Sequence, residues 1–297
     1  MKNLWNDHEA AKAHDKLDLL VYSSRLIGSE PKLCVWGGGN TSTKVVGKDH
    51  CSRRTRILYI KGSGSDLKVS TRQDYPPVRL DDLQQVFKRD QMPDEEMVDY
   101  VSRCLLEPKA ARPSIEVLLH AFVDQPDIHH THADAILSIT NTKNGEKIAR
   151  KIFKDELLWI PYIKPGFTLA KWVGEAYRKN PKPKALILEK HGLITWGPDA
   201  KTSYNLTIEM VTRAEKYLAA ARRKKLHWSP VVHPVYNSER RKAWLLKFLP
   251  AIRKTLSQNQ KTILTWNDSK DVLEFVNSRG AAEISQIGPA TPDHMLR

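Results

Sequence analysis

Cysteine is scarce in this 297-residue sequence, and its few positions exclude two kinds of structure. Cys34, Cys51 and Cys104 are the only three cysteines, and none of them forms a CxxC pair. An odd number without such spacing argues against a disulfide framework and against a thiolate metal site, and it favours reduced thiols in a cytoplasmic protein. The chain has no run of about 18 apolar residues, so we expect no transmembrane helix. Its polar start, MKNLWNDHEAAKAHDK, predicts no signal peptide.

Nucleotide-binding glycine motifs are also missing. The sequence contains neither GxGxxG after a predicted strand nor a Walker loop ending in Lys and Ser or Thr. We therefore expect no nucleotide cofactor in this chain. Internal repeats and low-complexity segments are absent as well, so the length is available for one large domain or two smaller ones.

Negative charge is in the minority, which leaves a strongly basic chain. Lys and Arg number 48 against 34 Asp and Glu, giving a net charge of +14 and a pI near 9.6. A positive field favours anionic ligands such as phosphorylated metabolites, nucleic acid or acidic membranes. The basic runs at 222–225 and 240–242 are interpreted as solvated surface. Because no base-reading motif accompanies them, we do not expect a nucleic-acid partner.

Hydrophobic patterning predicts a mixture of helices and strands without a regular βαβ rhythm, which favours a layered α/β sheet with antiparallel pairs. The expected strands are 33–36, 56–60, 128–132, 185–188, 193–196 and 262–266. The expected helices are 15–27, one from 93, 113–122, 204–223, 239–256 with a kink or break at Pro250, and 268–277. We expect a domain over 1–228 and an α/β extension over 229–297 that packs on it and ends in a linker-like segment, 288–294.

Three histidines suggest a metal site. His130 and His132 are two residues apart on a predicted strand, so their side chains share one face, whereas His129 faces the other way. His191 follows a second apolar strand. Three imidazoles with an open fourth position are the ligand set of a catalytic zinc ion. Taken alone, an HxH pair on a strand is more often two core or surface histidines that hold no metal.

Glu116 lies at the predicted start of the helix from 113. It fits either an acid that complements the helix dipole or a general acid/base beside the metal. His120, four residues later, fits a supporting or core position better than a ligand position.

Small-residue loops follow two of the strands. Glycines 37–39 precede Asn40, and a second loop covers 62–65. Glycine lets backbone N–H groups approach an anion closely, and Ser114 adds a contact at an expected helix start. Each loop alone is compatible with an ordinary turn. Together, in a chain of charge +14, they predict a phosphate site.

With these segments in order, the chain resembles the class II aldolase/adducin family. The resemblance extends from about residue 17 to 218 and rests on the ordered motifs GGGNTS, KGSGSDL, RPSIE, HHTHAD, PYIKPGF and EKHGLITWG. It implies a three-layer α/β/α sandwich around a mainly antiparallel sheet. It also implies a homo-oligomer, commonly a tetramer, with a small phosphorylated sugar as its substrate.

The resemblance assigns roles residue by residue. Zn²⁺, or another divalent metal, would be bound by His130, His132 and His191. Glu116 would be the catalytic acid/base, and Tyr162 would protonate the aldehyde oxygen, although the following residues are spaced differently here. The phosphate would contact Gly39, Asn40, Ser63, Gly64 and Ser114. Ile115 stands where some members have a second serine.

The start and end of the chain are most similar to the aldolase half of bifunctional rhamnulose-1-phosphate aldolase/alcohol dehydrogenase proteins. The resemblance implies a carbon–carbon lyase that cleaves a ketose 1-phosphate to dihydroxyacetone phosphate and an aldehyde such as lactaldehyde. Two alternatives stay open. One is a sugar-phosphate epimerase of the same fold, and the other is a non-catalytic scaffold like adducin.

Overall fold

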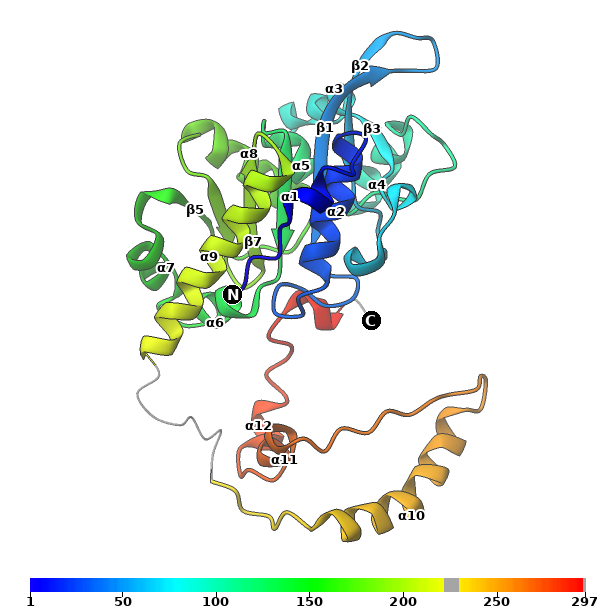
Figure 1. The fold of residues 1–297 in the computed structure, drawn as a ribbon, viewed down its shortest axis with the longest axis vertical. Helices are drawn as coiled ribbons and strands as arrows, with labels where there is room; N and C mark the ends of the chain where they lie inside the picture. The colour runs from blue at the N-terminus through cyan, green and yellow to red at the C-terminus, as the bar shows by residue number, and fades with distance from the viewer. Residues whose placement is uncertain (222–229, 296–297) are drawn as a thin grey trace. The chain divides into compact units, whose positions relative to one another are not determined.

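The computed structural model describes residues 1–221 and 230–295. These fall into two compact units, one formed by 1–221 together with the C-terminal segment from Pro289, and the other ending at Gly288 (Figure 1). The predicted boundary at 228 and 229 and the basic run at 222–225 lie outside the described residues. Among the described helices, none has the length and apolar character needed to cross a membrane.

A seven-stranded sheet forms the centre of the first unit, in the order β3-β2-β1-β4-β7-β6-β5. All neighbouring strands are antiparallel except β5 and β6, which are parallel. The strands are β1 (Asn40–Lys48), β2 (Arg54–Ile60), β3 (Pro77–Arg79), β4 (Asp127–Thr131), β5 (Leu157–Ile160), β6 (Ala185–Leu188) and β7 (Gly192–Gly197). The predicted hairpin of 185–188 with 193–196 is therefore confirmed as β6 and β7.

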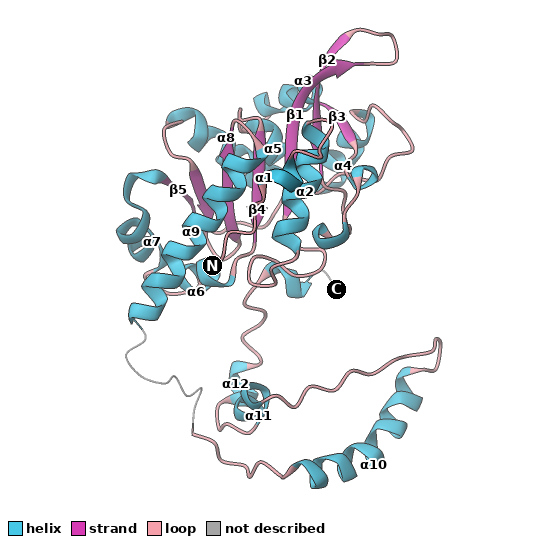
Figure 2. Ribbon diagram, in the orientation of Figure 1, coloured by secondary structure: helices cyan, strands magenta, loops and turns pink. Residues whose placement is uncertain are grey.

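Helices cover both faces of this sheet (Figure 2). They are α1 (Asp7–Ala10), α2 (Lys16–Gly28), α3 (Leu80–Gln85), α4 (Asp94–Arg103), α5 (Val117–Phe122), α6 (Asp134–Thr140), α7 (Gly145–Phe153), α8 (Phe167–Lys179) and α9 (Ala200–Ala221). Short 3-10 turns are η1 (Leu67–Val69), η2 (Arg72–Asp74), η3 (Val86–Lys88) and η4 (Lys154–Glu156). The helices predicted at 15–27, from 93 and from 204 correspond to α2, α4 and α9.

Side chains of the strands alternate between two separate cores. In β6, Leu186 and Leu188 pack in a cluster with α3, α4, α5 and α8, whereas Ala185 and Ile187 pack in a cluster with α6, α7 and α9. A strand buried on both faces needs a helical layer on each side. The predicted three-layer α/β/α sandwich around a mainly antiparallel sheet is confirmed.

Helix α5 starts later than the sequence predicts. The expected start at 113 is wrong, because the preceding backbone pairs with the loop after β2. The Ser114 N–H donates to the Lys61 carbonyl at 3.0 Å, and Gly62 and Pro113 form an isolated antiparallel bridge. Glu116 consequently occupies the cap position of α5 and not its first turn.

Residues 33–36 form no strand, contrary to the prediction. Leu33 and Cys34 are buried in the core cluster that also contains residues of α6, but the Leu33 N–H donates to the Glu30 carbonyl within a turn. A short apolar run does not reveal whether its backbone pairs with a neighbour. The strand of this region is β1, which follows the glycine loop and does not precede it.

The regular elements among the described residues of the second unit are helices, joined by loops. Its helices are α10 (Ser238–Leu256), α11 (Lys270–Val276) and α12 (Ala281–Ile284), none of which buries a residue. Helix α10 continues through Pro250, so the predicted break is absent, and α11 confirms the helix expected near 268–277. The strand predicted at 262–266 is wrong, because no described residue of this unit offers that segment a pairing partner.

The last described residues belong to the first unit. A 3-10 turn, η5 (Pro292–Met295), follows Pro289, and Asp293 is buried there. The Asn141 side chain donates to the Ala290 carbonyl at 2.8 Å. This segment, 289–295, therefore differs from the linker-like tail that the sequence predicts.

Candidate metal centre

Strand β4 brings two histidines to one place. It lies in the middle of the sheet between β1 and β7, and His130 pairs in register with Asn40 on one side and Ile194 on the other. His132 directly follows the strand. Their Nε2 atoms are 3.1 Å apart, and both side chains are buried.

His191 reaches the same point from the turn between β6 and β7. One nitrogen from each of His130, His132 and His191 can be chosen so that all three lie within 4.8 Å of one another. Gly192 makes this approach possible. A Cβ at position 192 would lie 2.9 Å from a ring carbon of His130 and 3.1 Å from one of His132, so a side chain there would displace the rings.

Glu116 faces the three rings. Its Oε2 lies 3.4 Å from the Nε2 of His130, and its Oε1 lies 3.4 Å from the Nε2 of His191. Oε1 is buried and has no hydrogen-bond partner among the described residues. A buried carboxylate oxygen without a donor is costly, unless a cation or a substrate group completes its surroundings.

A hydrogen-bonded chain of buried side chains fixes Glu116. The Asn40 amide donates to Glu116 Oε2 at 2.6 Å and to Ser114 Oγ at 3.2 Å. His120 contacts the Asn40 carbonyl oxygen at 2.6 Å and the Ser42 hydroxyl at 2.7 Å. Because an amide oxygen only accepts, the His120 ring must donate to it, which orients the Asn40 amide toward Glu116. His120 is thus a supporting residue, as the sequence suggested.

Electrostatics favours a carboxylate among neutral rings. Burial opposes ionisation of Glu116, but the rings of His130 and His191 and the Asn40 hydrogen bond outweigh it and lower its pKa to about 2. Burial lowers the pKa of His191 to about 4 and also lowers the pKa of His130, against the opposing charge of Glu116. At neutral pH the rings of His130 and His191 are therefore uncharged and can offer lone pairs to a metal ion.

Two of the three rings, those of His130 and His132, have a hydrogen-bond acceptor at the Nδ1 atom, which faces away from the cluster. The Nδ1 of His130 lies 3.1 Å from the Leu193 carbonyl oxygen, and the Nδ1 of His132 contacts the Asp293 carboxylate. Sequence reasoning missed Asp293, because it lies in a Pro- and Gly-rich segment 161 positions from its partner. Its only sequence signal is an acidic residue within an otherwise apolar and turn-forming stretch.

The predicted phosphate loops lie next to one another. The Ser63 N–H donates to the Arg112 carbonyl at 2.7 Å, which joins the loop after β2 to the segment before α5. Ser63 and Gly64 are exposed, whereas Gly39 and Ser114 are buried.

Asn40 stands apart from the other predicted phosphate contacts. Both of its amide hydrogens are used within the protein, so its position suits holding Glu116.

Lys61 is a further buried residue near these loops that the sequence reasoning left without a role. Its ammonium donates to the Gly37 carbonyl at 3.0 Å. Burial lowers its pKa, although Cys34 and Glu116 oppose the shift. It places a cationic group beside the glycine loop, and the motif KGSGS was the available signal.

Tyr162 is not brought to the cluster in this structure. Its side chain is 57% exposed, and over the described residues no hydrogen bond or ring contact joins it to the histidines or Glu116. Ile115 is also exposed and lines a hollow of about 100 Å³ with Ser63 and Ser114.

The side chains present fit a divalent metal ion. Three nitrogen donors converge, and the oxygen of Glu116 that has no partner among the described residues lies beside them. Three imidazoles with room for a further ligand suit Zn²⁺ and also other first-row divalent ions.

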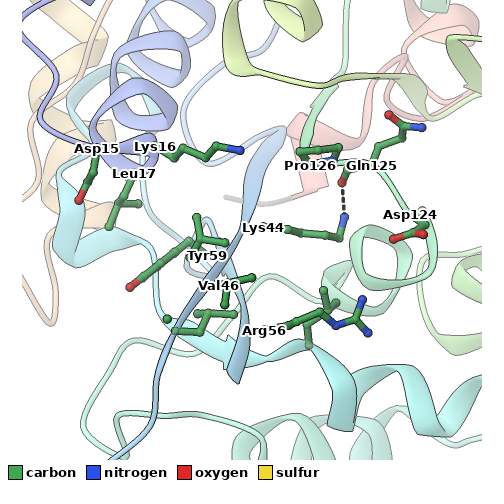
Figure 3. Close-up of a pocket in the computed structure, with 14 residues that line it drawn as sticks. Asp15, Lys16, Leu17, Lys44, Val46, Arg56, Tyr59, Asp124, Gln125 and Pro126 are labelled. Atoms are coloured by element: carbon green, nitrogen blue, oxygen red, sulfur yellow. Dashed lines mark hydrogen bonds between the residues drawn. The ribbon is translucent and has the colours of Figure 1, made fainter. Parts of the chain in front are cut away.

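A second hollow of about 750 Å³ lies toward the opposite end of β1 (Figure 3). Two of its three basic side chains, Lys44 and Arg56, already have partners. Lys44 donates to the carbonyls of Val123 and Gln125, and Arg56 pairs with Asp81. This hollow carries no cluster of metal-ligating groups among the described residues, so the histidine cluster is the candidate site.

Comparison with known protein families agrees with this geometry. Residues 18–218 match the class II aldolase and adducin N-terminal domain, and residues 243–297 match the aldolase class II second domain. A Bacillus subtilis protein named uncharacterized oxidoreductase YuxG is 43% identical over 296 residues. That match covers 100% of this chain and 43% of the relative, so the chain spans less than half of the relative's length.

Solved structures agree as well. The N-terminal class II aldolase domain of a conserved Thermoplasma acidophilum protein is 42% identical and superimposes with a TM-score of 0.68, covering 73% of this chain and 99% of that one. A sugar-phosphate aldolase from Thermotoga maritima shares the fold at 15% identity, with a TM-score of 0.53 over 71% of this chain and 97% of that one. The family match extends over most of the chain and includes every member of the histidine cluster. This chain belongs to the class II aldolase and adducin family.

Proposed function

We propose that this protein is a divalent-metal-dependent aldolase that cleaves a ketose 1-phosphate, of the rhamnulose-1-phosphate type, to dihydroxyacetone phosphate and a small aldehyde such as lactaldehyde. One observation carries the proposal. Three buried imidazoles converge beside a carboxylate whose Oε1 has no partner among the described residues. A carboxylate used only for structure would have its oxygens satisfied.

A Zn²⁺ or similar ion bound by His130, His132 and His191 would supply a Lewis acid that polarises the substrate carbonyl. Glu116 handles the proton. In the direction of synthesis, its Oε1 removes a proton from the carbon of dihydroxyacetone phosphate that will form the new bond. In cleavage, the hydroxyl of the departing aldehyde carbon gives its proton to the ionised Glu116 as the carbon–carbon bond breaks, and Glu116 returns that proton to the carbon of dihydroxyacetone phosphate. Asn40 keeps the carboxylate oriented through both directions.

The phosphate would be held at the adjoining loops. Ser63 and Gly64 are exposed beside Ser114, in a chain of net charge +14. Fixing the distant phosphate lets binding energy orient the reacting carbon. In this proposal Tyr162 reaches the aldehyde oxygen only in a substrate-bound arrangement.

Glu116→Gln gives the direct test. The amide keeps the shape and the Asn40 contact but cannot accept the proton. We expect metal content to stay at the wild-type level, while release of dihydroxyacetone phosphate from a panel of ketose 1-phosphates falls by roughly 10²- to 10⁴-fold. The control is Glu175→Gln, an exposed carboxylate on α8. Unchanged turnover in Glu116→Gln would remove this residue from the mechanism.

The same assay separates the alternatives. A changed sugar-phosphate configuration with no released aldehyde would identify an epimerase. Absence of bound metal in the purified protein, with no turnover of any ketose phosphate after metal addition, would leave a non-catalytic scaffold. The name of the Bacillus subtilis relative refers to an oxidoreductase, but this chain aligns with only 43% of that protein. We assign lyase chemistry to the aligned part.

A further inference from the structure

The His132 ring is held by a residue that lies far away in the sequence. Its Nδ1 contacts a carboxylate oxygen of Asp293, whereas the Nδ1 of His130 contacts a backbone carbonyl. An ionised carboxylate can only accept a hydrogen bond, so the proton of His132 must sit on Nδ1. The lone pair is then on Nε2, the atom that faces the other two rings.

Asp293 is itself firmly placed. It is 3% exposed, and its second oxygen accepts a hydrogen bond from the Val35 N–H at 3.0 Å. The segment around it is tied to the same unit by the Asn141–Ala290 hydrogen bond. Burying a carboxylate is costly unless donors satisfy it. Here one donor is the backbone before the glycine loop and the other is the His132 ring.

The glycine loop is shaped around this carboxylate. A Cβ built on Gly38 would lie 1.8 Å from Oδ1 of Asp293, which is far inside any allowed contact. Gly37 and Gly39 have positive φ angles, but Gly38 does not, so its backbone does not require glycine. Glycine at position 38 therefore leaves room for the Asp293 carboxylate, which a side chain there would block.

From these contacts we propose that Asp293 is a positioning residue of the metal centre, and that segment 289–295 is part of that centre. The carboxylate fixes the tautomer and the orientation of His132 and makes its Nε2 a stronger ligand. This inference rests on the proposed metal site. It extends that site to the C-terminal segment, which contains none of the residues in the proposed mechanism.

Metal binding and docking of segment 289–295 are coupled in both directions. If Asp293 improves metal binding through His132, then bound metal must stabilise the docking of this segment by the same free energy. Hydrogen exchange of the amides in this segment should slow when Zn²⁺ is added to the metal-free protein. Thermal unfolding should show a larger metal-dependent rise in Tm for the wild type than for a variant without the carboxylate.

Two variants perturb the contact independently. Asp293→Asn removes the charge. Gly38→Ala keeps the aspartate in the sequence but pushes its carboxylate away from its present position. We expect each to weaken Zn²⁺ binding, measured by competition with a chromophoric chelator, by roughly 10- to 100-fold. The matched control is Asp134→Asn, an exposed carboxylate two positions after His132, for which we expect less than about a threefold change, because an exposed charge is screened.

Further readouts separate positioning from general loosening of the fold. The visible absorption of the Co²⁺-loaded protein should differ between wild type and Asp293→Asn, because the orientation of one ligand ring changes. The metal-free Tm of Asp293→Asn should stay close to that of the wild type. A lowered metal-free Tm with an unchanged metal-dependent rise would overturn the inference, as would an affinity within threefold of wild type in either variant. Failure of the wild type to bind any divalent ion would instead overturn the proposed function.

Discussion

Both faces of strand β4 carry buried histidines, but the histidines of the two faces have different neighbours. On one face His130 meets Glu116 and the other rings of the cluster. On the other face His129 contacts the hydroxyls of Ser23 and Ser203, at 2.9 and 2.7 Å. All of these side chains are buried. The first face gathers groups that can bind an ion, and the second ties one ring to two helices.

The two sides of β4 also differ in the pKa of their buried carboxyl groups, Glu116 and Asp127. Glu116 is 6% exposed and Asp127, on the His129 side of β4, is 2% exposed. The imidazoles and Asn40 overcome the effect of burial and lower the pKa of Glu116 to about 2, whereas burial raises the pKa of Asp127 to about 7. Burial alone therefore does not identify a functional acid. The partners supplied by neighbouring elements decide its charge.

Replacing a histidine on each face should give the sharpest contrast. His130→Ala removes a proposed ligand, and we expect Zn²⁺ affinity to fall by more than the roughly 100-fold upper range for a supporting residue. Aldolase turnover should fall with it. Isothermal titration with Zn²⁺ measures this loss. Retention of tight binding in His130→Ala would show that the two faces do not differ as proposed.

His129→Ala should have the opposite pattern. We expect the metal content per folded molecule to match the wild type, while the free energy of unfolding of the metal-free protein decreases by about 2–3 kcal/mol. The reason is that Ser23 and Ser203 lose a buried hydrogen-bond partner and a cavity is left behind. Urea denaturation gives the energy, and metal analysis of the same sample gives the control. Loss of metal without loss of stability would contradict the comparison.

A third contrast should appear in the pH dependence of stability. The pKa of Asp127 is raised in the folded state, so the folded protein keeps this proton while the unfolded chain loses it. The resulting stabilisation is complete below about pH 4, the ordinary range for Asp, and is lost as pH rises toward 7. Relative to Asp127→Asn, the wild type should lose on the order of 3 kcal/mol between pH 4 and 7. If the free energy of unfolding changes with pH by the same amount in wild type and Asp127→Asn, Asp127 does not titrate as described.

The sequence predicted the parts of the site that depend on local periodicity. The alternation of side chains along β4 is enough to separate His129 from His130 and His132, and the apolar run of β6 predicts where the third ring follows. The residues missed were those whose role depends on distant pairing. Asp293 acquires its partner only when the C-terminal segment docks, and no spacing in the chain encodes that contact.

The fold shows the same limit. The segment 33–36 has the composition of a strand, but its backbone turns and the Val35 N–H donates to Asp293. The segment 262–266 has strand-forming residues but no described strand beside it. A β-strand requires a neighbouring strand to pair with as well as strand-forming residues. A single sequence reveals the residues but not the neighbouring strand. The late start of α5 likewise follows from its pairing with the loop after β2.

Hydrogen bonding between β4 and β7 already sets the spacing of the segments that carry all three rings. In small zinc domains the ion must organise the chain, and removing it unfolds them. Here the ladder and the two helical layers hold the segments of the three histidines in place, so the fold does not depend on the ion that we propose. A chelator should consequently strip this protein without unfolding it, and the empty protein could be recharged with whichever divalent ion its surroundings supply.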